Sequence, residues 1–219
     1  MEIEKVNKRI GNLIKLKPEY EERYKILHKH TFPCVLDRIR KSNIRNYSIF
    51  LLNGILFSYY EYVGKDYISD INSTADETTK DWWKLTDPMQ EPLPVRKQGE
   101  WWAEMEMLQH FDEIIKPYTA VERHGYTAEI KISDEKIVIN LFKEFNESFI
   151  PFFKNSFIQN HSVFLKDGKL YVYFEYAGKN FANDDEELNG KEELKKWNAG
   201  LEQCLSSSWK EMKEVFHTH

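Results

Sequence analysis

The sequence predicts an α+β protein built from two ferredoxin-like halves, and three observations support this prediction. First, residues 46–51 and 59–65 reappear, nearly unchanged, as residues 160–165 and 173–179. The offset is constant (160 − 46 = 114 and 179 − 65 = 114), which marks an internal repeat of domain size. Second, each half has the order β-α-β-β-α-β, the ferredoxin-like arrangement. Third, 219 residues suffice for two small domains.

The first half supplies a clear signal for each of its elements. Apolar residues alternate in a strand over about 9–17, and Pro18 suits the first position of a helix. This helix extends to about Lys41, and Pro33 should kink or break it. Asn53-Gly54 is a strong hairpin signal. The other predicted elements are the hairpin strands 47–52 and 55–63, a helix over about 75–85, and a last strand over about 104–111.

The second half repeats this order after a join at about 112–126. Its terminal strand aligns with that of the first half at an offset of 107 (209 − 102 and 217 − 110), because it lacks a proline-rich insertion. The predicted elements are strands over 127–132, 162–165, 169–177 and 209–217, and helices over 135–155 and 191–204. We therefore expect one domain over 1–115 and a second over 116–219.

A tandem copy of this kind predicts a fused dimeric α+β barrel. One ferredoxin-like unit leaves a sheet face exposed, and two sheets that face each other bury both. The symmetric interface of a dimer would then lie within one chain. The alternative is two separate domains on a string, but the join contains apolar residues and is no Gly/Ser linker. Whether the fused pair associates further stays open.

Composition excludes several classes of protein. The net charge of −5 argues against a nucleic-acid binder, which would show a basic stripe. No apolar run approaches the roughly 20 residues that span a membrane, and no secretory signal is evident. Cys34 and Cys204 lack CxxC spacing and are typical of reduced packing residues in a cytoplasmic protein. Nucleotide and metal motifs such as GxGxxG and HExxH are absent, so we expect no cofactor and no metal.

Aromatic residues make up 15% of the chain, and several lie beside polar residues that could carry chemistry. Tyr24 and His28 are four apart and share one helix face. The pair Trp82-Trp83 lies near the end of the second helix, and Tyr47 opens a hairpin strand. Each has a structural alternative: a helical histidine is more often a hydrogen-bonded residue than a catalyst, a tryptophan pair is more often core, and Tyr47 could pack across strands.

These residues resemble the pattern of the L-rhamnose mutarotases over about residues 9–111. The matching segments are Glu22-Arg23-Tyr24-x-x-x-His28-x-x-x-Phe32-Pro33, Asn46-Tyr47-Ser48-Ile49-Phe50-Leu51, Trp82-Trp83-Lys84 followed by Asp87, and the strand from Trp102 to Phe111. The resemblance implies a dimeric α+β barrel in which each unit holds a pyranose sugar. It also implies that His28 is the proton donor and that Tyr24, Tyr47, Trp82 and Trp83 contact the sugar.

The first half departs from the family pattern in two places. Phe32 stands where the family has tryptophan, and the loop over 87–99 is a variant of its own. These departures leave the identity of the sugar open between L-rhamnose and L-fucose.

The second half has lost most of the candidate residues. An alignment of Pro151 with Pro33 places Phe142 at the position of Tyr24 and Asn146 at that of His28. His161 replaces Tyr47, Trp197 takes the place of Trp83, and Lys196 takes that of Trp82. We therefore predict one working site, in the first half, and a second half that acts mainly as a structural partner.

Mutarotation explains why such a site needs a histidine. The reaction opens a hemiacetal ring and recloses it on the other carbonyl face, so the ring oxygen gains a proton and the anomeric hydroxyl loses one. Histidine, with an unperturbed pKa of about 6.5, can do both near neutrality, and no cofactor is needed. The base could be Tyr24, a bound water, or His28 itself.

The leading hypothesis is a cytoplasmic mutarotase that acts on a 6-deoxy-hexose monosaccharide. The second is a non-catalytic carbohydrate-binding or regulatory protein, because the second half is degenerate. The third is another enzyme on the same barrel, such as a cofactor-independent oxygenase or a lactone isomerase, because fold does not determine function.

Overall fold

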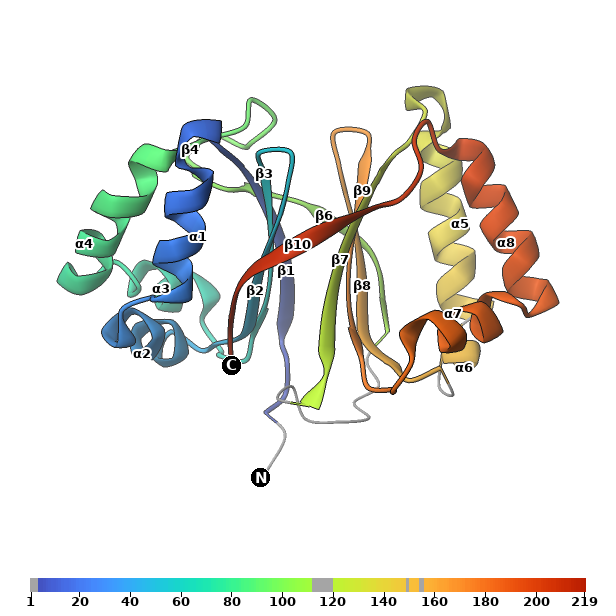
Figure 1. Ribbon diagram of the computed structural model, residues 1–219, viewed down its shortest axis with the longest axis horizontal. Helices are drawn as coiled ribbons and strands as arrows, with labels where there is room; N and C mark the ends of the chain where they lie inside the picture. Colours follow the sequence, from blue (N-terminus) through green and yellow to red (C-terminus); the bar gives the residue numbers. More distant parts are fainter. Residues whose placement is uncertain (1–3, 112–119, 149, 154–155) are drawn as a thin grey trace. The chain divides into compact units, whose positions relative to one another are not determined.

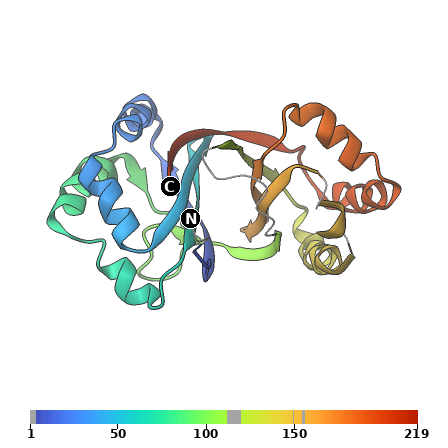
Figure 2. The ribbon, with the colours of Figure 1, turned by 90° about the horizontal axis from the view of Figure 1, so that it is seen from below.

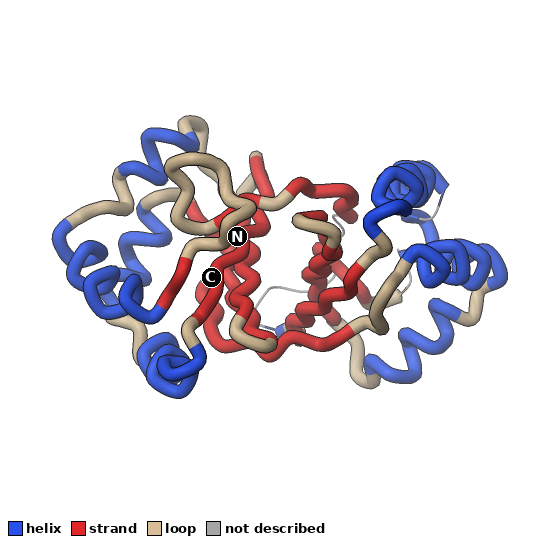
Figure 3. Tube along the Cα trace, turned by 90° about the horizontal axis from the view of Figure 1, so that it is seen from above, coloured by secondary structure: helices blue, strands red, loops and turns tan. Residues whose placement is uncertain are grey.

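The computed structural model describes residues 4–111, 120–148, 150–153 and 156–219 (Figure 1). The chain divides into two compact units. The first unit comprises Met1–Met105 with Lys213–His219, and the second comprises Glu106–Met212. Each unit is an antiparallel sheet with its helices on one face, which Figures 2 and 3 show from two further directions. The predicted α+β class with two ferredoxin-like units is confirmed.

The first unit has the strand order β4-β1-β3-β2-β10, with β5 also paired to β1. Strands β2 and β3 form the predicted hairpin, and the predicted helix is broken before Pro33, which begins a second helix. The elements are β1 Lys8–Leu16, η1 Pro18–Tyr20, α1 Glu21–Lys29, α2 Pro33–Lys41, β2 Ile44–Leu52, β3 Ile55–Tyr62, α3 Tyr67–Asn72, α4 Glu77–Thr86, η2 Asp87–Met89, β4 Gln90–Glu91 and β5 Ala103–Glu104.

The second unit has the matching order β10-β7-β9-β8-β6. Its first strand lies earlier than the predicted 127–132, so the predicted join overlaps this strand; residues 112–119 of the join lie outside the described residues. The elements are β6 Glu106–Phe111, β7 Glu122–Glu129, η4 Ile132–Asp134, α5 Glu135–Ser148, α6 Ile150–Phe153, β8 Ile158–Lys166, β9 Lys169–Tyr176, α7 Phe181–Asn189, α8 Glu192–Cys204 and β10 Lys210–Thr218.

The last strand of each half is divided between the two units. The terminal strand of the first half consists of β5 and β6. Of these, β5 pairs with β1 in the first unit, whereas β6 pairs with β8 in the second. In β10, the residues up to Met212 pair with β7, whereas those from Lys213 onward pair with β2. We expected the boundary between the domains to lie between residues 115 and 116. The compact units are instead divided after Met105 and after Met212, because each terminal strand ends in the sheet of the other half.

The first helices of the two units begin at a constant offset in the sequence. The helices η1 and η4 begin 114 residues apart (132 − 18), as do α1 and α5 (135 − 21). His28 therefore corresponds to Phe142, and Tyr24 to Val138. This corrects the expectation that Asn146, whose side chain lies outside the described part, replaces His28. The alignment on prolines failed because α5 continues over residues at which the first unit ends one helix and begins another.

The second pair of helices is offset by one more residue. Helix α4 follows its N-cap Asp76 and α8 follows its N-cap Lys191, so the offset is 115 (191 − 76). Trp82 therefore corresponds to Trp197 (197 − 82 = 115). This corrects the expectation that Trp197 takes the place of Trp83.

A buried carboxylate explains part of the repeated sequence. Glu61 is fully buried and accepts hydrogen bonds from Asn46 Nδ2 and the Tyr59 hydroxyl, each at 3.1 Å. In the second unit, Glu175 accepts the same bonds from Asn160 (2.9 Å) and Tyr173 (2.8 Å). A buried charge requires such donors. These repeated residues are therefore structural.

The repeated Tyr-x-Gly that follows is a second structural device. The Tyr62 hydroxyl donates to Asp70 at 2.5 Å, and Tyr176 donates to Asp184 in the same way. A Cβ on the second-unit glycine, Gly178, would overlap the Tyr176 ring and its hydroxyl. Glycine thus leaves room for the tyrosine to turn back over the chain.

No helix in the described residues is long and apolar enough to span a membrane. Both cysteines are free thiols, Cys34 exposed and Cys204 buried.

We expect Gly178→Ala to lower the free energy of unfolding by about 1–3 kcal/mol, because the added methyl group must displace the Tyr176 ring. Urea denaturation followed by circular dichroism measures the change. The control is Gly200→Ala in α8, where the nearest heavy atom would lie at 3.9 Å. This variant should gain about 0.5–1 kcal/mol from helix propensity. Equal midpoints for the two variants would contradict the prediction.

Candidate functional site

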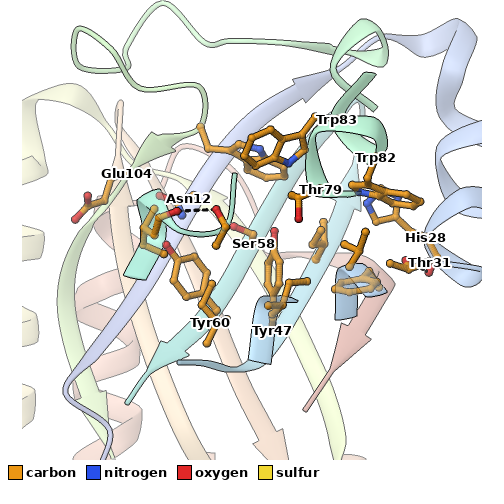
Figure 4. Close-up of a pocket in the computed structure, with 18 of the residues that line it drawn as sticks. Asn12, His28, Thr31, Tyr47, Ser58, Tyr60, Thr79, Trp82, Trp83 and Glu104 are labelled. Carbon is orange, nitrogen blue, oxygen red and sulfur yellow. Dashed lines mark hydrogen bonds between the residues drawn. The ribbon is translucent and has the colours of Figure 1, made fainter. Parts of the chain in front are cut away.

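The first unit contains a cavity of about 410 Å³ between its helices and its sheet. Figure 4 shows His28 and Trp82 at one end of the cavity, Tyr47 in the middle, and Asn12 and Glu104 at the other end. The residues that line it include His28, Thr31, Tyr47, Thr79, Trp82, Trp83 and Phe216, together with Asn12, Ser58, Tyr60, Tyr67, Glu100, Trp102 and Glu104. The cavity therefore combines aromatic walls with several hydroxyl, amide and carboxylate groups.

His28 is held by the helix that carries it. Its Nδ1 lies 3.0 Å from the backbone oxygen of Tyr24, one turn earlier in α1. A carbonyl can only accept, so Nδ1 carries the proton and Nε2 is an acceptor. Among the described residues nothing hydrogen-bonds to Nε2, and His28 lines the cavity. Nε2 of this cavity-lining residue thus keeps a free lone pair.

Burial keeps this imidazole neutral. Desolvation lowers the pKa of His28 to about 4 from its usual 6.5, opposed by the hydrogen bond to Tyr24. At neutral pH, His28 is therefore a proton acceptor at Nε2 and becomes a donor only after it has taken a proton.

Aromatic rings surround the histidine. Tyr24 stacks on it with centroids 3.8 Å apart, Trp82 meets it edge-on at 5.3 Å, and Phe216 at 5.6 Å. Phe32 packs edge-on against Trp82 at 5.2 Å. The contacts fix the ring plane and exclude water from most of its surface.

Tyr47 reaches the cavity through a bulge in β2. The register with β3 shifts between Arg45 and Ser48, and Asn46 takes a left-handed φ of 48°. A bulge turns the following side chain relative to the regular pleat. The Tyr47 ring lies edge-on against Tyr60 and Phe216, each at 5.5 Å. Burial raises the pKa of Tyr47, so its hydroxyl stays protonated.

Tyr24 supports the site and does not line it. It is fully buried beneath His28, and burial raises the pKa of Tyr24 well above its usual value. It therefore stays a phenol and is no candidate for the base. The structure brings His28, Tyr47, Trp82 and Trp83 together around one cavity, as predicted for a site, with Tyr24 behind them.

The polar end of the cavity was not predicted from the sequence. Asn12 and Ser58 lie opposite each other on β1 and β3, and Tyr60 hydrogen-bonds Tyr67 at 2.8 Å. Glu104 lies on β5, which also pairs with β1. The one available signal was strand periodicity, since residues two apart on a strand share a face. No group of three or more His, Cys, Asp or Glu side chains within the described ranges is placed to hold a metal ion.

Comparison with solved structures shows which known proteins share the fold. The chain is similar to a provisional monooxygenase from Fusobacterium nucleatum, with a TM-score of 0.61 and 13% identity over 99% of this chain and 96% of that chain. It is also similar to another provisional monooxygenase, from Lactobacillus acidophilus NCFM, with a TM-score of 0.60 and 8% identity over 96% and 95% of the two chains. At these identities the likeness shows the fold alone.

Comparison of sequences shows the family. The L-rhamnose mutarotase family matches residues 9–111. The L-rhamnose mutarotase of Lactiplantibacillus plantarum is 31% identical over 83 residues, which are 37% of this chain and 78% of that protein. The family match over residues 9–111 contains His28, Tyr47, Trp82 and Trp83. The chain therefore belongs to the L-rhamnose mutarotase family.

Proposed function

We propose that the chain is a mutarotase that interconverts the α and β anomers of a 6-deoxy-hexose such as L-rhamnose or L-fucose. One observation carries the proposal: a neutral His28 presents a free Nε2 to a cavity lined by indole rings and hydroxyl groups. The family assignment supports the same reaction.

The cavity suits a pyranose in both shape and chemistry. The C–H faces of a sugar ring pack against aromatic faces, which Trp82 and Trp83 supply. The sugar hydroxyls need both donors and acceptors, which Asn12, Ser58 and Tyr60 supply at the other end. A 6-deoxy sugar carries a methyl group that an apolar wall accommodates at no hydrogen-bonding cost.

A single imidazole can carry the proton transfers. Nε2 of His28 takes the proton of the anomeric hydroxyl, a C=O bond forms at C1, and the C1–O5 bond breaks. The imidazolium then protonates O5, which is within reach because O1 and O5 are bonded to the same carbon. After rotation about C1–C2 the steps run in reverse on the other carbonyl face. The protonated imidazole thus fills the donor role that the resemblance implies.

We also propose a location and an origin for the protein. We place the protein in the cytoplasm, because its two cysteines are free thiols. We also propose that the two units arose by duplication, supported by the constant spacing of their elements and by the matched buried carboxylates Glu61 and Glu175.

We expect His28→Phe to lower kcat by about 10²–10⁴-fold, the usual contribution of a positioned proton-transfer group. The fold should tolerate phenylalanine, because Phe142 in the second unit packs against Trp197 at 5.2 Å and 74°, much as His28 packs against Trp82 at 5.3 Å and 72°. Exchange NMR of the anomeric protons measures the rate with L-rhamnose and L-fucose.

The matched control is Phe142→His, which should add no activity, because Tyr126 and Val172 replace the polar groups Asn12 and Ser58 in the second cavity. Calorimetry of sugar binding, alongside the exchange rate, separates an enzyme from a carbohydrate-binding protein. If the wild type and His28→Phe bind sugar but neither accelerates anomer exchange, the protein is a carbohydrate-binding protein. If the wild type neither binds sugar nor accelerates exchange, the proposal is wrong.

Activity should stay level from neutral pH downward and fall as the pH passes through about 4, because protonation of His28 removes the Nε2 acceptor. Its pKa is depressed in the folded state, so this group also makes the folded state less stable as the pH drops from 6.5 to about 4. NMR titration of the His28 ring protons, with exchange rates corrected for the uncatalysed reaction, checks both. A titration midpoint near 6.5 would contradict the prediction.

Trp83→Ala should raise KM about tenfold and change kcat by less than about threefold, because the indole packs on the sugar but does not handle the proton. The side chain is 36% exposed, so its removal should leave the fold intact. Steady-state anomer conversion against sugar concentration separates KM from kcat. A loss confined to kcat would argue against this role.

A further inference from the structure

The second unit contains a cavity of its own, of about 330 Å³. Helices α5 and α8 contribute Phe142 and Trp197 to its wall, and strands β8 and β9 contribute His161, Val172 and Phe174. Each of these residues corresponds to a residue of the first cavity at an offset of 114 or 115. The second cavity thus occupies the same place in its unit as the sugar site occupies in the first.

The second cavity lacks polar groups at three positions where the first cavity has them. Where the first unit has Ser58 and Tyr60, the second has Val172 and Phe174 (172 − 58 = 114 and 174 − 60 = 114). Where the first has His28, the second has Phe142. At these three positions the hydroxyl groups of a sugar would lose their hydrogen bonds to water without replacement, which is costly. This part of the wall therefore disfavours a sugar and favours an apolar ring.

The cavity is nevertheless open. Protein interiors are close-packed, and an unfilled space destabilises a protein in proportion to its volume. A unit that served only as a structural partner would gain stability from side chains that fill this space. Instead, Phe142, Val172 and Phe174 are buried and still leave about 330 Å³ between them. This volume suits a small ligand.

His161 is a polar residue in the sheet wall of the cavity. His161 Nδ1 lies 2.8 Å from Gln109 Oε1, which can only accept, so Nδ1 carries the proton and Nε2 is an acceptor. Among the described residues no group hydrogen-bonds to this Nε2. Burial, together with nearby His110, lowers the pKa of His161 to about 3, so the ring stays neutral. The ring lies within 6 Å of Phe153 and Phe174.

A second acceptor lies at the edge of the cavity. The Asp185 carboxylate on α7 accepts from Asn189 Nδ2 at 2.9 Å, and the Asn189 side-chain oxygen accepts from Asn198 Nδ2 at 2.9 Å. Asp185, Asn189 and Asn198 all line the cavity. Each amide nitrogen gives one of its two hydrogens to a neighbouring side chain, so this edge offers oxygen acceptors and amide hydrogens, while Nε2 of His161 is an acceptor at the sheet.

We propose that the second unit binds a flat aromatic molecule that carries a hydroxyl or amino hydrogen-bond donor. Its ring would lie among Phe142, Phe174 and Trp197, and its donor would bond to His161 Nε2. This ligand differs in class from the sugar of the first unit, and the proposal does not depend on the proposed mutarotase activity.

The test uses the full chain, 2-naphthol as the probe, and its methyl ether as a matched probe that lacks the donor. Calorimetry should show one site for 2-naphthol, with about three- to tenfold tighter binding than the ether, the range of one hydrogen bond. Nuclear Overhauser contacts should connect the naphthol ring to the Val172 methyl groups. L-rhamnose should not compete.

Two variants locate the site. Val172→Phe fills the cavity and should abolish binding of both probes, and His161→Phe should remove the preference for 2-naphthol while the ether still binds. Trp83→Ala, in the other cavity, should leave binding of 2-naphthol unchanged. No binding to the wild type, equal affinities for the two probes, or contacts to residues of the first cavity would each overturn the proposal, even where Val172→Phe does not fold.

Discussion

The candidate site depends on one hydrogen bond within α1, from His28 Nδ1 to the backbone oxygen of Tyr24 at 3.0 Å. The bond places the proton on Nδ1 and so leaves the lone pair of Nε2 free in a side chain that lines the cavity. It also opposes the desolvation that lowers the pKa of His28, but does not outweigh it. The tautomer of His28 thus follows from a contact that spans one helical turn, whereas its neutral state follows from burial.

The terminal strands link each cavity to a distant part of the sequence. Phe216, near the end of the chain, completes the aromatic wall around His28, and Gln109, near the middle, sets the tautomer of His161. Both residues follow a register shift in their strands, β10 and β6. The two occupy matching places (216 − 109 = 107), yet one is apolar and the other polar. The residue at this place on the terminal strand thus sets the contact of the neighbouring side chain: Phe216 packs on Tyr47 of β2, and Gln109 accepts a hydrogen bond from His161 of β8.

Local signals in the sequence predicted most of the fold. The Asn53-Gly54 turn, Pro18 and the alternation of apolar residues all describe interactions within a few residues of one another, and the structure has the hairpin and the helices there. The division of each terminal strand between two sheets could not be predicted, because the sequence of a strand does not show which sheet edge it will pair with. Of the cavity, His28 and the tryptophans were found through the family resemblance. Asn12 was not, because nothing in an isolated strand shows which face a helix will cover.

The comparison of the two units separates the residues that build the fold from those that carry chemistry. Glu61 and its donors recur in the second unit because a buried carboxylate cannot lose them without a large cost. The positions that line the cavities are free of this constraint, since a ligand or water can replace a lost contact there. They differ at nearly every step, from His28 to Phe142 and from Ser58 to Val172. Because the scaffold stays the same while the lining changes, the differences between two similar units locate the chemistry more sharply than the similarities do.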